Sequence, residues 1–243
     1  MLRQYRMDLH IHTCLSPCGA SEMVPTRIVA RAKELSIDAI GVCDHNASEN
    51  VHAVRRACEK AGVGIFGGME ITSREEIHLL ALFGEDRGLA GMQELVGKHL
   101  HGANDPEVFG PQYIVDEEDY VNAECGRLLI SATDISIEEI VLSVHLLGGL
   151  AIASHIDREV FSIVSQLGFI PPGLELDALE VSPRGMNTGF EYSSFGFPIV
   201  SFSDAHQLKD IGRATTTFSL ESPSFEELKK ALCGVGERKL ALD

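Results

Sequence analysis

The chain contains no tryptophan, and aromatic residues make up only 6% of its 243 residues. This scarcity disfavours proteins that bind single-stranded nucleic acid by stacking bases on aromatic side chains. Basic residues are also few: 20 lysines and arginines stand against 36 aspartates and glutamates, which gives a net charge of −16. A surface of that sign repels a phosphate backbone, so we expect no tight non-specific binding of nucleic acid. A small anionic substrate is compatible with it where local cations or metal ions attract the anion.

Long apolar runs are missing as well. No run approaches the roughly 20 residues that a transmembrane helix needs, and the N-terminal residues MLRQYRMDLHIH lack the apolar stretch of a signal peptide. The six cysteines form no CxxC pair. Reduced thiols are therefore expected rather than a disulfide framework. These features together predict a cytoplasmic protein with no membrane partner.

Hydrophobic residues make up 44% of the chain, which is enough to fill a core, and the length suits one domain over residues 1–243. Segments of strand length alternate with segments of helical periodicity, and this alternation predicts an α/β fold built on a parallel sheet or barrel. The expected strands are 7–12, 38–43, 63–69, 77–83, 150–154, 178–181, 199–202 and 215–218. The expected helices are 25–35, 49–61, 89–100, 136–147 and 225–232.

One segment interrupts this alternation. Residues 101–115 begin with HGANDPEVFGPQ, which carries two glycines and two prolines and has no hydrophobic period. An ordered loop of that length is uncommon in a compact domain and is often functional. We therefore expect a loop insertion at about 101–115, with a plain surface connection as the alternative.

The motif D-x-H-x-H lies at the end of the first expected strand. Side chains two residues apart on a strand point the same way. His10 and His12 can therefore face one metal ion, with Asp8 on the same side, while Leu9 and Ile11 face a buried layer. The motif indicates a pair of metal ligands at the mouth of a barrel.

The same kind of residue recurs where other expected strands end. Polar, ionisable side chains directly after a buried parallel strand lie where α/β folds build their sites. They are Asp44, His45, Asn46, Glu70, His155, Asp204 and His206, joined by His78 at the start of the strand 77–83. This set exceeds the four ligands that a zinc site typically takes. It predicts a multinuclear hydrolytic site, because paired ions can hold a hydroxide and clamp a phosphoryl group.

Six short motifs, in the order DLHIHT, VCDHN, GME, IHL, ASH and SDAH, resemble those of the PHP (polymerase and histidinol phosphatase) family. The resemblance extends from about Asp8 to Arg213. It implies a distorted seven-stranded (β/α) barrel of the TIM-like kind with a trinuclear site of zinc, manganese or iron. It also implies phosphoesterase chemistry as the commonest activity.

The resemblance assigns nine residues to three metal ions. The implied ligands are His10, His12, Glu70 and Asp204 for the first ion, Glu70, His78 and His155 for the second, and His45, His206 and Cys18 for the third. Family members usually offer His or Asp at the place where this chain has Cys18. A thiolate is a good ligand for zinc and a poorer one for manganese, so ligation by Cys18 would favour zinc or iron. The alternatives are a weak or missing third ion, with Cys18 as a buried thiol. Zinc is the expected metal overall, with manganese or iron as alternatives. Asp8 and Asp44 match positions that orient ligand imidazoles by hydrogen bonds.

A phosphate substrate also needs positive charge beyond the metals. Arg158 follows His155 by three residues, where similar phosphatases place a phosphate-binding arginine. Arg184 follows the expected strand 178–181 and should also lie near the mouth. The planar guanidinium of arginine binds phosphate through two parallel hydrogen bonds. Lys209 and Arg213 are weaker candidates for the same role.

The expected reaction is hydrolysis of a small phosphate monoester by a metal-generated hydroxide, with Glu70 and Asp204 as the catalytic residues. No nucleophilic side chain is required. Two alternatives stay open at this point. One is hydrolysis of a nucleotide phosphodiester or bisphosphate, and the other is a non-catalytic metal-binding PHP module with a structural or regulatory role.

Overall fold

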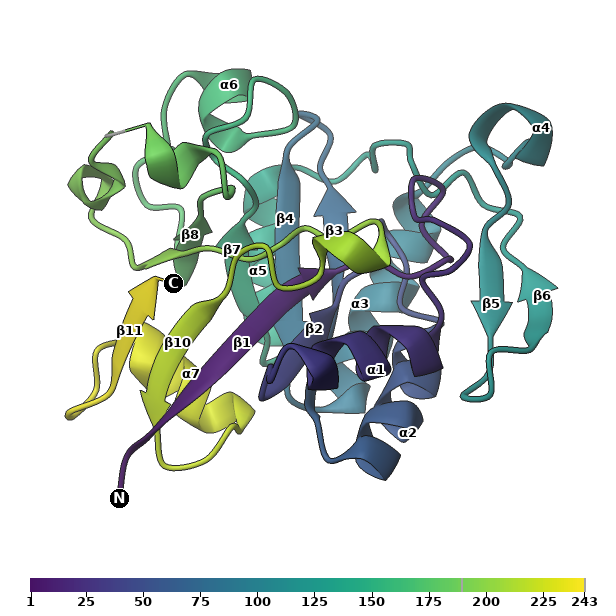
Figure 1. The fold of residues 1–243 in the computed structure, drawn as a ribbon. Helices are drawn as coiled ribbons and strands as arrows, with labels where there is room; N and C mark the ends of the chain where they lie inside the picture. Colours follow the sequence, from purple (N-terminus) through teal and green to yellow (C-terminus); the bar gives the residue numbers. More distant parts are fainter. Residues whose placement is uncertain (189, 243) are drawn as a thin grey trace.

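The computed structural model describes residues 1–188 and 190–242 (Figure 1). Its strands are β1 (Arg3–Ile11), β2 (Ala39–Val42), β3 (Gly64–Thr72), β4 (His78–Phe83), β5 (Tyr113–Val115), β6 (Val121–Glu124), β7 (Leu150–Ala153), β8 (Ala178–Glu180), β9 (Ile199–Val200), β10 (Thr216–Leu220) and β11 (Lys239–Leu242). The described residues form one nine-stranded sheet in the order β11-β10-β1-β2-β3-β4-β7-β8-β9, and β5 pairs with β6 separately. The edge strands β9 and β11 come into contact, so the large sheet curls into a barrel.

This architecture confirms the expected PHP-type α/β barrel, but its main sheet has nine strands where seven were expected. It is also not wholly parallel. The sets β1-β2-β3 and β7-β8-β9 run parallel, whereas β4 is antiparallel to both of its neighbours and β10 is antiparallel to β1. The short connection between Thr72 and His78 explains why β4 runs antiparallel to β3, because a parallel crossover needs a dozen or more residues.

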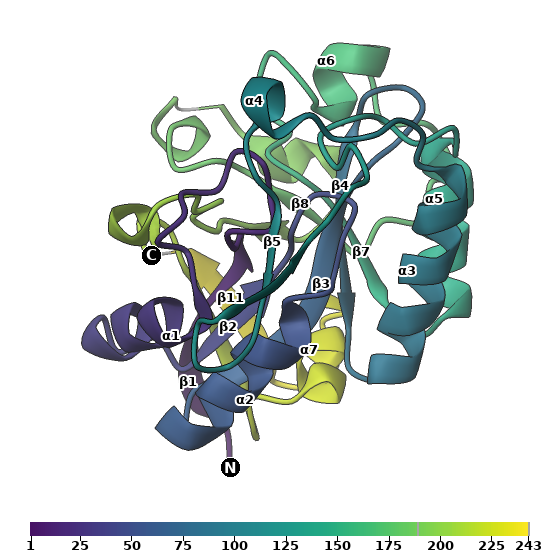
Figure 2. The same ribbon diagram turned by 90° about the vertical axis from the view of Figure 1, so that its right-hand side faces the viewer.

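The helices are α1 (Pro25–Glu34), α2 (Val51–Ala61), α3 (Asp86–His99), α4 (Pro106–Phe109), α5 (Ile137–Leu146), α6 (Ile163–Leu167) and α7 (Phe225–Leu232). Of these, α1, α2, α3 and α5 cover the outside of the barrel. Figure 2 shows α1 beside α2 on one flank and α3 beside α5 on another. Pro25 at the first turn of α1 and a capping box between Ser136 and Glu139 at the start of α5 fix where these helices begin.

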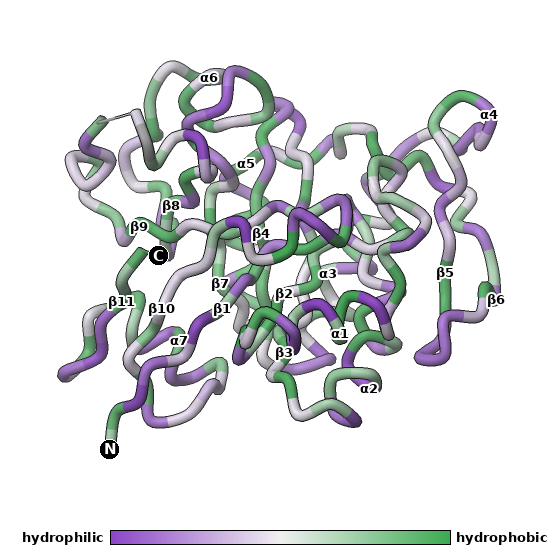
Figure 3. Tube along the Cα trace, viewed as in Figure 1, coloured by the Kyte–Doolittle hydropathy of each residue, from purple (hydrophilic) through white to green (hydrophobic). Residues whose placement is uncertain are grey.

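Two apolar clusters fill the molecule. One lies between the sheet and the helices and includes Ile40, Val54 and Ile140. The other lies inside the barrel, where Phe202 and Phe218 are fully buried with residues of α7. Figure 3 shows hydrophobic colour along the central strands and hydrophilic colour on outer loops. The barrel is thus a packed core closed by α7 at the end where β1 begins, which leaves polar chemistry to the opposite end.

The segment between α3 and α5 contains α4 and the hairpin β5-β6, which projects beside α1 and α2 (Figure 1). Asn50 holds the hairpin: its side-chain amide donates to the Tyr113 carbonyl at 3.0 Å and to Thr13 Oγ1 at 2.9 Å, and its Oδ1 accepts from the Val115 N–H at 2.9 Å. The expected loop at 101–115 therefore takes on local structure. It is tied to the loop that follows β1.

Three 3₁₀ turns complete the described structure: η1 (Gly185–Asn187), η2 (Tyr192–Phe195) and η3 (Leu208–Asp210). The first two lie after β8 and the third follows β9. All three stand near the mouth of the barrel rather than in its core. No helix within residues 1–188 and 190–242 is long and apolar enough to cross a membrane.

Candidate metal centre

A bulge in β1 aims its histidines at the mouth of the barrel. Asp8 pairs with Ile40 and Ile11 pairs with Val42. β1 therefore has one more residue than β2 between these two pairs, which is a β-bulge. Asp8 and Ile11 therefore face the same side, and Ile11 packs there with the helices. His10 and His12 face the other side. The expectation that Asp8 shares a face with the two histidines is wrong, because the bulge breaks the simple alternation.

Asp8 has a different task. Its carboxylate accepts hydrogen bonds from the backbone N–H groups of Ser203 at 3.0 Å and Gly212 at 2.8 Å. Burial raises the pKa of Asp8 to about 6 despite these bonds. The side chain thus fixes the loop that carries Asp204 and does not orient an imidazole.

The Glu70 carboxylate is the centre of the site. Glu70 lies in β3, two residues before the strand ends, and is 1% exposed. Its two oxygens lie 3.1 to 3.5 Å from ring nitrogens of five imidazoles, namely His10, His12, His45, His78 and His155. His78 reaches it from the start of β4 because β4 runs antiparallel to β3 and so begins at the edge where β3 ends.

A second carboxylate, Asp204, faces the same histidines. Its Oδ1 lies 3.4 Å from His10 Nε2 and 3.2 Å from His12 Nε2. The backbone of Asp204 has a φ of 47°, and His155 and Asn46 have φ values of 29° and 50°. A positive φ is uncommon for residues other than glycine. Three strand ends thus adopt strained turns that point polar side chains into one site, a pattern that clusters at functional sites.

Two buried hydrogen bonds orient the β1 histidines. His10 Nδ1 lies 3.0 Å from both oxygens of Glu180, which is 1% exposed, and His12 Nδ1 lies 2.9 Å from Ser16 Oγ. Ser16 in turn donates to Asp44 at 2.7 Å. These contacts leave Nε2 of each histidine facing Glu70 and Asp204. Asp44 therefore orients His12 indirectly, through Ser16. Glu180 orients His10, and this residue was not among those predicted from the sequence.

Charges in the site shift several pKa values. Burial lowers the pKa of His10, but the carboxylates of Glu180, Glu70 and Asp204 outweigh burial and raise it well above its ordinary value. Burial likewise lowers the pKa of His12, and hydrogen bonds to Asp204 and Glu70 raise it to about 9. In the chain without ions, protons on these two imidazoles therefore balance the two carboxylates.

The pKa values of two other imidazoles, His45 and His206, are lowered instead of raised. Burial lowers the pKa of His45 well below its ordinary value, and neighbouring imidazoles add to the effect. Burial and His12 lower the pKa of His206 to about 4. Both imidazoles are neutral at pH 7, which is the form that binds a metal ion.

The donor set fits transition-metal ions. Three groups of ligand atoms each lie within 4.8 Å of one another: His10, His12, Glu70 and Asp204; His45, Glu70 and His78; and His12, His45 and His206. Among the described residues, buried His45 Nδ1 and His78 Nδ1 make no hydrogen bond of good geometry, although they lie 3.2 and 3.1 Å from Glu70 oxygens. Imidazole and carboxylate donors suit zinc, manganese and iron. Buried ligand atoms that face one space without such hydrogen bonds fit one or more divalent ions.

These groups match the sequence-based ligand sets in part. The set proposed for the first ion is brought together as one group. His45 joins Glu70 and His78, where His155 had been expected, and His155 Nε2 lies 3.2 Å from Glu70 Oε1. Cys18 belongs to none of the three groups. The residue as a whole is exposed, but its thiol faces the interior, where burial and the carboxylates of Glu70 and Asp204 raise its pKa.

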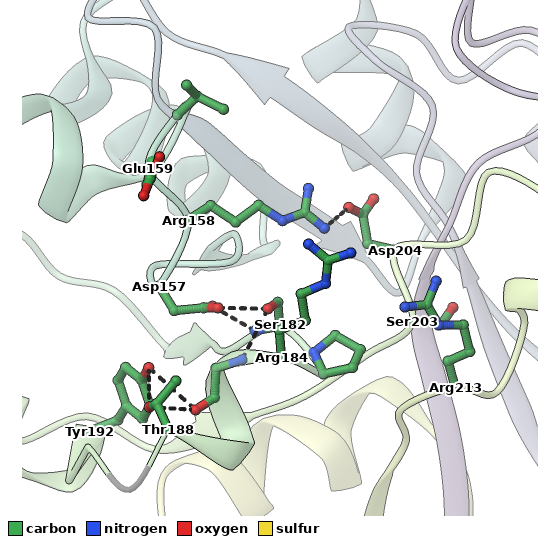
Figure 4. A pocket seen from close by; sticks show the side chains of 13 residues that line it. Asp157, Arg158, Glu159, Ser182, Arg184, Thr188, Tyr192, Ser203, Asp204 and Arg213 are labelled. Carbon is green, nitrogen blue, oxygen red and sulfur yellow. Dashed lines mark hydrogen bonds and ion pairs between the residues drawn. The ribbon is translucent and has the colours of Figure 1, made fainter.

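A pocket of about 710 Å³ opens beside Asp204. Arg158, Arg184 and Arg213 line it, and Figure 4 shows Arg158 and Arg184 extending toward Asp204. Arg158 Nη2 donates to Asp204 Oδ2 at 2.5 Å. The pocket therefore places cationic side chains next to the carboxylate that the histidines share. Lys209 lies in η3 and does not line it.

The fold and the site together define a class: a barrel protein whose mouth carries several histidines around the Glu70 and Asp204 carboxylates, a donor set that could hold metal ions. A family model described as PHP domain matches residues 8–163, more than half of the chain, and a model described as PHP-associated matches residues 191–233. The chain therefore belongs to the PHP family, as its motifs had suggested.

Solved structures show the same fold. The lesion-specific endonuclease PfuEndoQ from Pyrococcus furiosus superposes with a TM-score of 0.71 at 21% identity, over 98% of this chain and 58% of that one. A two-domain protein with a PHP-like metal-dependent phosphoesterase region from Bacteroides vulgatus gives 0.58 at 17% identity, over 100% and 65%. A protein from Bifidobacterium adolescentis, described as a metal-dependent phosphoesterase, gives 0.57 at 17% identity, over 93% and 95%. No curated relative matches the chain.

Proposed function

We propose that this protein hydrolyses a small phosphate monoester. The observation that carries the proposal is the arginine-lined pocket of about 710 Å³ beside Asp204, which puts cationic side chains next to the candidate metal ligands. Bound ions would generate hydroxide from water near neutral pH and neutralise charge on phosphoryl oxygens. We further propose that residues 1–243 act as one unit, because both matched family segments contribute strands to one sheet.

In this proposal the protein's own residues hold and orient the reactants. Glu70 and Asp204 position the ions, as the catalytic carboxylates, together with the imidazoles around them. Glu180 and Ser16 hold His10 and His12 in the tautomer whose Nε2 faces the site. Arg158 would bind the substrate phosphate through its planar guanidinium, and Arg184 would supply further positive charge from the neighbouring wall.

We propose two or three ions and zinc as the principal metal. The support is the presence of three overlapping ligand groups, with Glu70 shared between two of them. A third ion would use His45, His206 and Cys18. We also propose that the protein works in the reducing cytoplasm, since the six cysteines are all unpaired in the structure.

A phosphodiester substrate is the second candidate. Endonuclease Q has been solved with a 27-mer duplex substrate that carries an abasic lesion at its active site. The present chain spans 58% of the length of that protein. Its net charge of −16 opposes the binding of long polyanions, and this charge favours a small substrate over a strand of nucleic acid.

The decisive experiment compares ester classes on protein whose metals have been counted. Phosphate release should be measured from a panel of alkyl monoesters, and cleavage from a phosphodiester and from a duplex with an abasic site. We expect turnover of monoesters that depends on added zinc or manganese. Preferential cleavage of the duplex would transfer the proposal to nucleic acid, and no turnover of any ester would favour a structural module.

Arg158→Ala tests the phosphate-binding role within the same assay. A charge-assisted hydrogen bond contributes about 1.5–3 kcal/mol, so kcat/KM should fall about 10- to 100-fold. Arg158→Lys should recover only part of the loss, because an ammonium lacks the planar fork. The metal content should stay, since arginine is not a ligand.

The matched control is Arg56→Ala, which removes an exposed arginine that pairs with Glu117 on the outer surface. We expect this variant to hydrolyse the best monoester like the parent. Equal activity of Arg158→Ala and the parent would contradict the assignment and move the role to Arg184.

A further inference from the structure

Phe161 lies against the candidate metal centre, on the loop between β7 and α6. Its ring stacks on the His78 imidazole, with the ring centroids 4.6 Å apart and the two planes 12° from parallel. The Phe161 carbonyl also accepts the backbone N–H of His78 at 2.9 Å. The side chain and the backbone of one residue therefore both hold the first residue of β4.

The other neighbours of the His78 ring belong to the site itself. His78 Nδ1 lies 3.1 Å from Glu70 Oε1, and the rings of His45 and His155 lie 5.1 and 5.4 Å away at steep angles of 59° and 64°. Phe161 is 38% exposed, whereas His78 is 9% exposed. The phenyl ring therefore lies between the imidazole and solvent.

The backbone of Phe161 is strained, with a φ of 58°. A positive φ is uncommon for residues other than glycine and is an outlier for a bulky side chain. Contacts on the preceding residues brace the loop, since the Ser162 hydroxyl donates to the Arg158 carbonyl at 2.8 Å and the Arg158 N–H donates to the His155 carbonyl at 2.9 Å. Such outliers cluster at functional sites, which directs attention to what the Phe161 ring does there.

We propose that Phe161 is a positioning residue of the metal centre. Its ring fixes the plane of the His78 imidazole and shields from water the ion that His45, Glu70 and His78 would share. This inference rests on the metal loading assumed in the proposed function, and it is independent of which ester is hydrolysed.

Two physical effects follow from the stacked ring. An imidazole covered on one face has fewer orientations open to it, so less freedom is lost when it binds an ion. The apolar ring also limits the access of water, and the hydrophobic groups around a metal site control that access. Both effects slow the loss of the ion. Tyrosine at position 161 would supply both, whereas leucine would supply apolar bulk without a flat face.

Release of zinc from loaded protein into an excess of a colorimetric chelator measures the effect. Aromatic pairs contribute about 2- to 10-fold in an equilibrium constant beyond the area they bury, so Phe161→Ala should accelerate one phase of release by about that factor. Phases from ions that do not use His78 should keep their rates. Phe161→Tyr should release zinc like the parent, and Phe161→Leu should fall between the parent and Phe161→Ala.

The matched control is Phe169→Ala, which removes an exposed ring on the loop after α6 and should leave every phase unchanged. Phe161→Gly separates the ring from the strained backbone. Glycine adopts a φ of 58° without a steric penalty, so its metal-free Tm should be at or above that of Phe161→Ala. Release should nevertheless be equally fast in both variants, because both lack the ring.

The visible absorption of cobalt-substituted protein reports the arrangement of the ligands directly. The bands should differ from those of the parent in Phe161→Ala and Phe161→Gly, and should match them in Phe161→Tyr and Phe169→Ala. A residue that only stabilised the fold would change Tm and leave these bands in place.

The outcomes separate this inference from the proposed function. Faster zinc release in Phe161→Ala, with Phe169→Ala like the parent, supports the role of Phe161 even if no ester is hydrolysed. If the parent hydrolyses monoesters while Phe161→Ala keeps the parent's release rate and cobalt spectrum, the proposed function stands and the role of Phe161 fails. A parent that binds no ion overturns both.

Discussion

At the scale of single residues, the orientation of His10 depends on one buried carboxylate. Both oxygens of Glu180 lie 3.0 Å from His10 Nδ1, and one of them also accepts the His155 backbone N–H at 3.2 Å. A carboxylate behind a ligand imidazole fixes its tautomer and raises its basicity. Glu180 is therefore a positioning residue that would act on a bound ion through His10.

Glu180→Gln should weaken metal binding about 10- to 100-fold while the fold is retained. The amide keeps the shape of the side chain, but it has lost the negative charge and has one acceptor oxygen for two N–H groups. Competition with a chelator of known affinity measures the change. Glu59→Gln on the exposed face of α2 is the control, and equal metal affinity in the two variants would contradict the role of Glu180.

Cys18 gives a second prediction at this scale. If its thiolate completes a third ion site with His45 and His206, Cys18→Ser should lower the metal content by up to one equivalent, since a hydroxyl is a poorer zinc ligand. Elemental analysis of protein purified without chelator provides the count. Cys233→Ser removes another exposed thiol as a control. An unchanged count in Cys18→Ser would show that the thiol is not a ligand.

At the scale of elements, close contact between strands limits what can stand at the barrel wall. A Cβ added at Gly41 in β2 would lie 2.3 Å from the Leu9 carbonyl oxygen of β1. That atom belongs to the backbone of the central strand and cannot move aside without disturbing the bulge. The small residue at position 41 thus permits β1 and β2 to pair beside the site.

Gly41→Ala should lower the free energy of unfolding by about 3 kcal/mol or more, because the overlap has no flexible side chain to relieve it. Gly126→Ala is the matched control. Its added Cβ meets nothing within 4 Å, so its effect should stay within about 0.5 kcal/mol. Urea unfolding measures both, and similar midpoints for the two variants would refute the close-contact argument.

The elements also show what the sequence could reveal. Periodic segments such as α1, α2 and α7 were predicted within one or two residues at most ends, since amphipathic patterns and Pro25 mark them directly. The antiparallel direction of β4 and the hairpin β5-β6 were not predicted. The direction of β4 depends on the length of the turn after Thr72. The hairpin is held by Asn50, which lies just before α2 and far from the hairpin in the sequence. Neither feature can be read from the spacing of hydrophobic residues in one segment.

For the site as well, features visible in the local sequence could be predicted and features set by distant contacts could not. Residues directly after strands were recognisable, because ionisable side chains stand out next to apolar runs. Glu180 was missed because it lies inside the expected strand 178–181, although a single charged residue in the buried stretch ALEV is a usable signal. The orientation of Asp8 was predicted wrongly because a bulge inverts the alternation and leaves no mark in composition.

At the scale of the whole molecule, stability without metal should depend on pH through His12. Its folded pKa of about 9 lies above the ordinary 6.5. The stabilisation from its protonated form is therefore complete below pH 6.5 and is lost as the pH rises through about 9. His206, with its pKa lowered to about 4, works in the opposite sense and removes stability as the pH falls from 6.5 toward 4.

Chelator-treated protein should thus have a lower Tm at pH 9.5 than at pH 6.5. The variant His12→Gln should show a smaller fall over the same range. Metal-loaded protein should also show a smaller fall, because an ion replaces the proton between Glu70 and Asp204. Thermal unfolding by circular dichroism measures all three, and equal falls in the parent and His12→Gln would rule out this source of pH dependence.

The pairing of β1 with β10, with Arg3 opposite Leu220, has a consequence for the synthesis of the protein. Asp204 follows His10 by 194 residues. At about 5–20 residues per second, a ribosome needs about 10–40 s to add that stretch. During this time a nascent chain displays His10 and His12 without the second carboxylate and without a partner strand on one side. An ion that needs both His10 and Asp204 could therefore be bound only late, when the last third of the chain has joined the barrel.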